Sequence, residues 1–310
     1  MTTGTGATGP GASSTGWNDG FISVDWGTTN RRAYLIGADG RQRDEMEDDQ
    51  GILSVATGQF HGAVQEIRAR LGDRPLLMGG MIGSNRGWVE APYVACPAGI
   101  EDLAKALRWI EGGRAAIVPG VSYRNGRAAD VMRGEEVQIL GAVAAGTIPA
   151  DCIVCHPGTH NKWIVVEGGR ITSFRTIMTG ELFSLLREHS ILADLLGGDA
   201  SPGAAFDEGV DYGLGNDDVV AELFSIRARV LLGAGERSAA ASYASGLLIG
   251  GDARVGLRAA PEGEEIIVMG RPELTELFAR AIARVGRGVR EVDGEEAFVA
   301  GTRAIAELLR

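Results

Sequence analysis

The sequence predicts an α/β protein made of two similar lobes, each a mixed sheet with a β-hairpin turn and flanking helices. A repeated turn motif is the first observation: Gly-Thr-x-Asn followed by a basic residue occurs at residues 27–31 and, 131 positions later, at residues 158–162. Both copies lie between an apolar strand and an outgoing strand, so a chance match of two ordinary turns is the weaker explanation. The length of 310 residues, at roughly 150 residues per domain, also accommodates two lobes.

The first lobe is expected over residues 20–135, after a tail at residues 1–19. The tail is rich in Gly, Ser and Thr and has no apolar period, so it is expected to be disordered; its formal Gly-x-Gly-x-x-Gly match lacks a flanking strand and helix. Apolar runs and turn residues predict strands at Phe21–Asp25, Arg32–Ile36, Arg41–Asp49, Pro75–Met78 and Ala115–Val118. Helical periodicity predicts helices at Gln59–Leu71, Glu101–Ile110 and Arg133–Ala145.

The second lobe is expected over residues 136–310 and begins in the same way, with strands joined by hairpins and then a helix. The predicted strands are Asp151–Cys155, Lys162–Glu167, Arg170–Thr176, Glu265–Met269 and Val289–Val292. The predicted helices are Thr179–Leu196, Asp217–Leu232, Ser238–Leu248, Glu273–Val285 and Glu295–Leu309.

The composition limits the partners of the protein. A net charge of −11 argues against nucleic acid or an anionic membrane as the main partner, although a local pocket can still be positive. No apolar run reaches the roughly 18 residues of a membrane helix, so no membrane partner is expected. The 3 cysteines cannot all pair and no cleavable leader is visible, which favours the reducing cytoplasm. Whether the chain forms a homo-oligomer is left open.

The two turns have the chemistry of phosphate sites. Glycine lets the backbone approach a ligand, and successive N–H groups with Thr hydroxyls form a concave anion site. This reasoning predicts nucleotide-phosphate contacts from Gly27, Thr28, Thr29, Asn30, Gly158, Thr159, His160 and Lys162. Asp25, just before the first turn, could hold Mg²⁺ directly or through waters. Lys162 could also be a solvated residue at a strand start, and no Gly-x-x-x-x-Gly-Lys-[Ser/Thr] motif occurs, which excludes the P-loop class.

Five blocks in order carry a resemblance to a known family. They are Val24–Asn30, Gly80–Trp88, Val131–Gln138, Pro157–Trp163 and Met178–Leu182. From about Phe21 to the C-terminus the chain resembles the 2-dehydro-3-deoxygalactonokinase family, within the actin, hexokinase and heat-shock-chaperone ATPase superfold of ribonuclease H-like lobes. The resemblance implies a cytoplasmic enzyme that uses ATP to phosphorylate the terminal C6 hydroxyl of 2-dehydro-3-deoxygalactonate in galactonate catabolism.

A kinase of this type needs a carboxylate that positions the attacking hydroxyl and accepts its proton. The resemblance places this residue on the helix that links the two halves, which starts near Arg133. Glu135 and Glu136 are the candidates, and only one can face the reaction because neighbouring helical residues point about 100° apart. We favour Glu135. Asp130 is an alternative base, and both glutamates could instead be ordinary first-turn residues that complement the helix dipole.

Substrate contacts are predicted on polar segments next to the strands. Ser84, Asn85 and Arg86 lie in a glycine-flanked loop and could bind the carboxylate of the keto acid, with Trp88 shaping the pocket, although a structural turn with a surface arginine fits the same residues. Thr179 and Glu181 open a helix whose N–H groups could meet an anion or a hydroxyl, but Thr179 could be a plain N-cap. Gly270 resembles the adenosine-contacting segment of the superfold; a simple helix start also explains it.

Other functional readings stay open. A kinase for a 2-keto-3-deoxy sugar acid of other stereochemistry would carry the same motifs, as would a phosphate-cleaving enzyme or a non-catalytic nucleotide-switch module of this superfold. The sequence Cys152-x-x-Cys155-His156 formally matches a haem attachment site or, with His160, part of a zinc site. We interpret it instead as a buried strand leading into the second turn.

Overall fold

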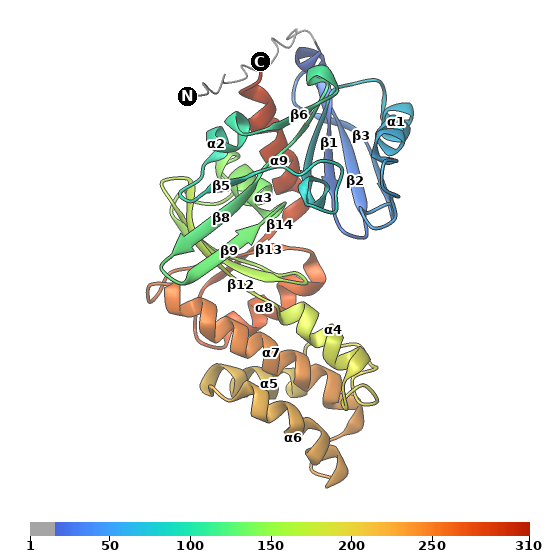
Figure 1. Cartoon of the computed structure of the whole chain (residues 1–310). Coiled ribbons are helices and arrows are strands. Elements are labelled where there is room, and N and C mark those ends of the chain that lie inside the picture. Colours follow the sequence, from blue (N-terminus) through green and yellow to red (C-terminus); the bar gives the residue numbers. More distant parts are fainter. Residues whose placement is uncertain (1–15) are drawn as a thin grey trace, which may run out of the picture. The chain divides into compact units, whose positions relative to one another are not determined.

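The computed structural model of the protein describes residues 16–310. This part of the chain divides into two compact units: the first runs to Gly146 and includes Glu296–Arg310, and the second is Thr147–Glu295. The α/β class is confirmed, since each unit contains a mixed sheet with helices (Figure 1). The units differ from the expected lobes in two ways: the boundary lies after Gly146 rather than at 135/136, and the C-terminal helix belongs to the first unit.

The main sheet of the first unit has the strand order β3-β2-β1-β4-β7-β6. Its strands are β1 (Gly20–Trp26), β2 (Arg31–Gly37), β3 (Gln42–Asp48), β4 (Leu76–Gly80), β6 (Arg108–Ile110) and β7 (Ala115–Ile117). The first three pair antiparallel, whereas β4 runs parallel to β1 and β7 parallel to β4. Because β1 is buried along almost its whole length, as its continuous apolar run predicts, it lies in the core of the unit.

The prediction of a disordered tail at residues 1–19 is wrong at the C-terminal end of that range. Residues 1–15 lie outside the described part of the chain. Trp17, by contrast, is buried: its ring packs against Phe21 and Trp109, and its indole N–H donates to the carbonyl of Gly113 (3.2 Å). The first unit therefore begins before Gly20.

A second, smaller sheet of the first unit was not predicted. It contains β5 (Tyr93–Ala95), β8 (Gly120–Asn125) and β9 (Ala128–Met132), in the order β5-β8-β9 (Figure 1). The helix expected at Glu101–Ile110 is also wrong in its second half: α2 (Ile100–Lys105) ends early, and β6 follows.

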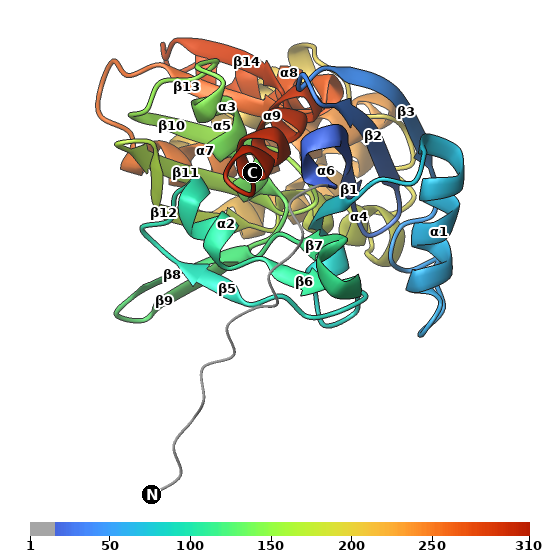
Figure 2. The same ribbon diagram turned by 90° about the horizontal axis from the view of Figure 1, so that it is seen from above.

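Two helices that are far apart in the sequence pack against each other in the first unit. These are α3 (Glu135–Ala144) and α9 (Gly294–Glu307), which lie side by side in both views (Figures 1 and 2), while α1 (Phe60–Leu71) packs elsewhere on the unit. A Cβ atom on Gly141 would lie 2.2 Å from the carbonyl oxygen of Ala297, so the two backbones touch. On α9, Thr302 shares a buried 2.7 Å hydrogen bond with Ser23 of β1. These contacts explain why α9 belongs with the first unit.

The sheet of the second unit repeats the core of the first. Its order is β12-β11-β10-β13-β14, with β10 (Cys152–His156), β11 (Asn161–Glu167), β12 (Arg170–Ile177), β13 (Ile266–Gly270) and β14 (Val289–Asp293). As in β3-β2-β1-β4-β7, an antiparallel run of strands is followed by parallel ones. The matching order supports the internal repeat predicted from the turns.

The helices of the second unit are α4 (Thr179–His189), α5 (Ala204–Gly215), α6 (Val219–Leu231), α7 (Ala240–Gly256) and α8 (Pro272–Ala283). The sequence did not predict α5, and α4 ends well before the expected Leu196. Helices α5 and α7 cross at glycines: Cβ atoms on Gly209 and Gly246 would lie 2.2 and 2.1 Å from the carbonyl oxygens of Tyr243 and Phe206. Close backbone packing is therefore one reason why the chain contains 47 glycines.

Replacing Gly246 with alanine is expected to lower the free energy of unfolding by about 1–3 kcal/mol, because overpacking forces the two helices apart. Gly215→Ala is the control, since a Cβ atom there would meet nothing within 4 Å. Urea denaturation followed by circular dichroism measures both variants. Equal stability of the two variants would show that α5 and α7 do not pack this closely.

Candidate active site

The first turn, residues 27–30, joins β1 to β2 and is held by the segment that follows β3. The amide of Gly51 donates to the carbonyl of Thr29 (3.0 Å), and the amides of Ile52 and Leu53 donate to Gly27 and Thr28 (3.0 and 3.2 Å). The carbonyl groups of the turn are thus used in holding it in place. The side chains of Thr28, Thr29 and Asn30 are exposed, which leaves them accessible to a ligand.

The basic residue after this turn has a structural role. Arg31 is 2% exposed, pairs with Asp48 (2.6 Å) and lies over the ring of Trp26. Its counterpart Lys162 in the second turn is also buried, and its Nζ donates to the carbonyl of His160 (3.0 Å). The basic residue of the motif is therefore buried in both units rather than exposed at the turn.

Asp25 lies near the end of β1, where a glycine leaves room beside it. It is half-buried and pairs in register with Gly79 of β4. A Cβ atom on the next residue, Gly80, would lie 3.3 Å from its carboxylate Oδ1. Gly80 and Gly134 both have positive φ (88° and 106°), and a Cβ atom on Gly134 would lie 3.3 Å from Gly80 Cα. The ends of β1 and β4 and the start of α3 thus meet at one point within the first unit.

The two candidate bases differ in accessibility. Glu136 is fully buried, and both of its carboxyl oxygens accept hydrogen bonds from the amide of Gly134 (2.9 and 2.8 Å). Burial, with a smaller effect from the neighbouring charge of Glu135, raises the pKa of Glu136 to about 8. Glu135 is only half-buried, and its Oε2 accepts from the amide of Arg133 (3.1 Å). Glu135 is therefore the carboxylate of this pair that a ligand can reach.

The loop at residues 83–87 is a tight turn. Ser84 is buried, its Oγ accepts from the amide of Arg86 (3.2 Å), and its carbonyl accepts from Gly87 (3.0 Å). Asn85 and Arg86 are exposed, while the half-buried Trp88 packs against the core of the unit. Asn85 and Arg86 are thus open to a ligand, whereas Ser84 mainly stabilises the loop.

The second turn, between β10 and β11, is held by a buried aspartate of α7. Asp252 is 2% exposed, and its Oδ1 accepts from Asn161 Nδ2 and Trp163 Nε1 (2.7 Å each). The hydroxyl of Thr179 donates to its Oδ2. Burial raises the pKa of Asp252 to about 6, although these hydrogen bonds lower it. The network ties the starts of β11 and α4 to α7.

Helix α4 begins directly against the second turn. The amide of Glu181 donates to the carbonyl of Thr159 (2.9 Å), and a Cβ atom on Gly180 would lie 2.6 Å from the carbonyl oxygen of Gly158. His160 Nε2 and Glu181 Oε2 are 2.5 Å apart. Glu181 therefore lies beside the turn, whereas the hydroxyl of Thr179, which is buried, is used to hold α4 in place.

The comparisons with known proteins agree with one another. A family model described as 2-keto-3-deoxy-galactonokinase matches residues 25–305. The chain belongs to this family. It is 34% identical over 288 residues to the 2-dehydro-3-deoxygalactonokinase of Escherichia coli (strain K12), covering 92% of this chain and 97% of that protein. The predicted resemblance and the predicted kinase class are thereby confirmed.

Solved structures show the same fold. A crystal structure of a protein from Sinorhizobium meliloti, ascribed to the 2-dehydro-3-deoxygalactonokinases, is 34% identical and superposes with a TM-score of 0.88, covering 93% of this chain and 98% of that one. Component A of the (R)-2-hydroxyglutaryl-CoA dehydratase of Acidaminococcus fermentans is 12% identical, with a TM-score of 0.53 over 94% of this chain and 98% of that one. This second likeness concerns the fold alone.

Sequence reasoning missed Asp252, because the predicted helix ended at Leu248. A carboxylate within the small and apolar run Leu247–Ala253 was the available signal, since such a residue needs buried donors.

Gly270 lies at the end of β13, where a Cβ atom would lie 3.4 Å from the carbonyl oxygen of Pro157. Asp130, on β9, accepts a hydrogen bond at Oδ1 from the amide of Val131 (2.8 Å).

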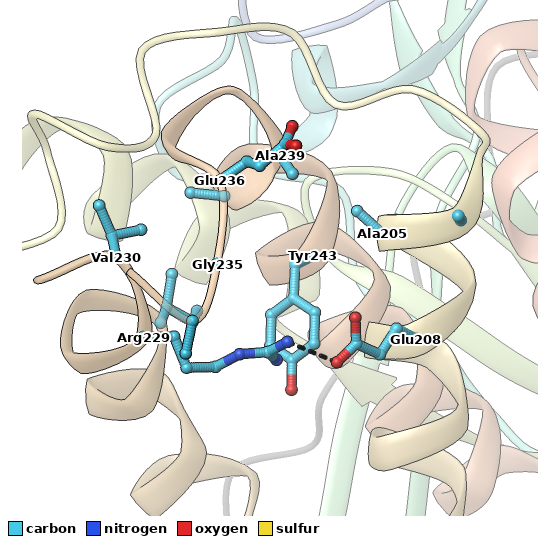
Figure 3. Close-up of a pocket in the computed structure, with 12 residues that line it drawn as sticks. Ala205, Glu208, Arg229, Val230, Gly235, Glu236, Ala239 and Tyr243 are labelled. Carbon is cyan, nitrogen blue, oxygen red and sulfur yellow. Dashed lines mark hydrogen bonds and ion pairs between the residues drawn. The ribbon is translucent and has the colours of Figure 1, made fainter. Parts of the chain in front are cut away.

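A cavity of about 280 Å³ lies in the second unit between α5, α6 and α7. Figure 3 shows Arg229 facing Glu208 (2.6 Å) beside the ring of Tyr243. The predicted site residues do not line this cavity.

Within residues 16–310 there is also no helix that could span a membrane and no cluster of His, Cys, Asp or Glu fit to hold a metal ion on its own.

Proposed function

We propose that this protein transfers the γ-phosphoryl group of ATP to the C6 hydroxyl of 2-dehydro-3-deoxygalactonate. Membership of the kinase family over residues 25–305 is the main support. Within the first unit, Asp25, Gly80 and Gly134 lie next to one another, and the accessible Glu135 directly follows Gly134. This arrangement is the observation that supports phosphoryl transfer. We further propose that the protein acts in the cytoplasm, which its 3 cysteines favour because they cannot all pair in disulfides.

Glu135 is proposed to position the C6 hydroxyl and accept its proton during transfer. A general base must be ionised before the reaction and must reach the hydroxyl. Glu135 meets the second condition better than Glu136, which is buried and bonded to Gly134. The amide of Arg133 donates to Glu135 Oε2 and so orients its carboxylate.

The two turns are proposed to bind the phosphates of ATP. Exposed Thr28 and Thr159 offer hydroxyl donors, and the contacts described above hold the backbone of each turn in place. Mg²⁺ commonly binds nucleotide phosphates together with only one or two protein carboxylates. The half-buried Asp25, with the space left by Gly80, fits that donor set. When bound, the ion would neutralise charge on the phosphates.

Replacing Thr28 or Thr159 with valine is expected to raise the KM for ATP while the protein stays folded. Each change removes a hydroxyl donor at nearly constant volume, and a hydrogen bond to a charged group contributes about 1.5–3 kcal/mol, which is roughly 10–100-fold in kcat/KM. The matched serine variants keep the hydroxyl and should behave like the wild type. Unchanged ATP kinetics in both valine variants would mean that the turns are only structural.

The substrate is tested with a coupled assay of ADP release against a panel of 2-keto-3-deoxy sugar acids. The galacto isomer is expected to have the highest kcat/KM. A preference for the gluco isomer would assign the protein to the other stereochemistry. Binding of ATP without ADP release for any sugar acid would favour a nucleotide switch, and ADP release that needs no sugar acid would favour a phosphate-cleaving enzyme.

A further inference from the structure

Arg133 has a buried side chain whose charge is only partly satisfied. It lies between β9 and α3 and is 9% exposed. Its Nη2 donates to the carbonyl of Ala91 (2.8 Å), and its guanidinium carbon lies 4.4 Å from the centre of the Tyr93 ring. Its Nε and Nη1 are buried and have no hydrogen-bond partner within residues 16–310. The side chain therefore still has N–H groups to donate.

Burying the Arg133 guanidinium with unsatisfied N–H groups costs free energy unless a ligand accepts hydrogen bonds from them. A guanidinium carries five N–H donors and is always charged, and leaving buried charged donors unsatisfied costs several kcal/mol. Glu135 accepts from the amide of Arg133 and Glu136 accepts from the amide of Gly134. The charge of Arg133 is among the smaller effects that lower the pKa of Glu136, but neither glutamate bonds to its Nε or Nη1. The raised pKa of Glu136 also keeps it mostly protonated at neutral pH. An anion is the group that would satisfy Arg133.

The position of Arg133 connects it to the predicted substrate loop. A Cβ atom on Gly83, the first residue of that loop, would lie 2.8 Å from Arg133 Nη1. The next residue, Gly134, packs on Gly80 beside Asp25. The guanidinium thus lies against the loop that carries the exposed Asn85 and Arg86, close to the point where β1, β4 and α3 meet. Tyr93, whose ring centre lies 4.4 Å from the guanidinium carbon, is 43% exposed and is therefore not a core residue.

We propose that Arg133 is the residue that binds the carboxylate of the sugar acid and so selects acids over neutral sugars. This inference rests on the proposed function. The sequence favoured Arg86 for this role, but an exposed arginine discriminates weakly because water satisfies its donors equally well. A buried guanidinium with two unsatisfied nitrogens gains most from a carboxylate, whose two oxygens match its planar donors.

The test compares 2-dehydro-3-deoxygalactonate with its neutral carboxamide as substrates for the full-length protein. The wild type is expected to prefer the acid. Arg133→Met should lower kcat/KM for the acid about 10–100-fold, change the carboxamide value only a few-fold and leave the KM for ATP unaltered. Arg133→Lys, which keeps the charge but loses the planar fork, should be intermediate. Arg127→Met, at an exposed arginine of the β8–β9 turn, is the control and should match the wild type.

The acid-to-carboxamide ratio does not depend on how much of a variant folds, so a folding defect cannot imitate the expected result. An acid preference that survives in Arg133→Met but is lost in Arg86→Met overturns the assignment to Arg133. A higher KM for ATP with an unchanged ratio also overturns it, since Arg133 would then bind a nucleotide phosphate. A wild type without activity on the acid contradicts the proposed function itself, and with it this inference.

Discussion

Glu135→Gln is expected to lower kcat by about 10²–10⁴-fold, because the amide cannot accept the proton of the substrate hydroxyl. The KM values for ATP and for the sugar acid should change little, since glutamine has nearly the same shape and can still bond the hydroxyl. The amide of Arg133 can also still donate to its carbonyl oxygen, as it does to Glu135 Oε2. Steady-state kinetics at saturating substrates and Mg²⁺ measure the effect.

Glu136→Gln is the matched control for this experiment. Glu136 is fully buried and, with a pKa of about 8, mostly protonated at neutral pH, so a neutral amide is a close replacement. The variant should therefore lose much less activity than Glu135→Gln. If Glu136→Gln or Asp130→Asn is the severe variant, the base is assigned to the wrong residue. If all of them lose no more than a few-fold, the catalytic carboxylate does not lie near the start of α3.

Asp252→Leu is expected to have the second largest effect, on both stability and the use of ATP. The change leaves the buried donors of Asn161, Trp163 and Thr179 without their acceptor. Each unsatisfied donor costs about 1–3 kcal/mol, so the free energy of unfolding should fall by more than about 3 kcal/mol. Because the second turn loses its anchor, the KM for ATP should rise about tenfold or more. Urea denaturation and ATP kinetics measure the two effects.

Asp252→Asn is the control, since its amide oxygen can still accept from Asn161 and Trp163. It also isolates the titration of Asp252, whose pKa is raised from 3.8 to about 6. The folded protein therefore holds a proton between pH 4 and 6 that the unfolded chain has released. The stability that Asp252 contributes should thus be present below pH 4 and fall as the pH rises towards 6. The asparagine variant should lack this decrease; an equal decrease in both proteins would assign it to other groups.

The sequence was most informative where a local pattern determines the structure. The strands around both turns, and the turns themselves, follow from apolar runs interrupted by Gly-Thr, and the repeat predicted the matching sheet orders. The small sheet was missed because β8 is mostly polar and β9 is largely exposed although most of its residues are apolar, so no alternation stood out. Helix α5 was missed because Gly209 and Gly213 lower helix propensity, although they are the residues that let α7 approach.

The site residues were predictable when their role is local, and not when it depends on distant contacts. Glu135 and Asp25 could be proposed from their place beside a helix start and a turn. The burial of Arg133 depends on contacts with Ala91, Tyr93 and Gly83, far away in sequence. Asp252 contacts β11 and α4 across many residues. Such roles need the folded chain, because the linear sequence does not show which donors meet which acceptors.

The most direct test of the account is to incubate the purified protein with MgATP and 2-dehydro-3-deoxygalactonate and to analyse both products. The account predicts that one ADP appears for each sugar acid consumed, that the sugar acid carries the new phosphate on its C6 oxygen, and that little ADP forms without the sugar acid. ADP release at the same rate without the sugar acid, or a phosphate on another oxygen, would contradict it.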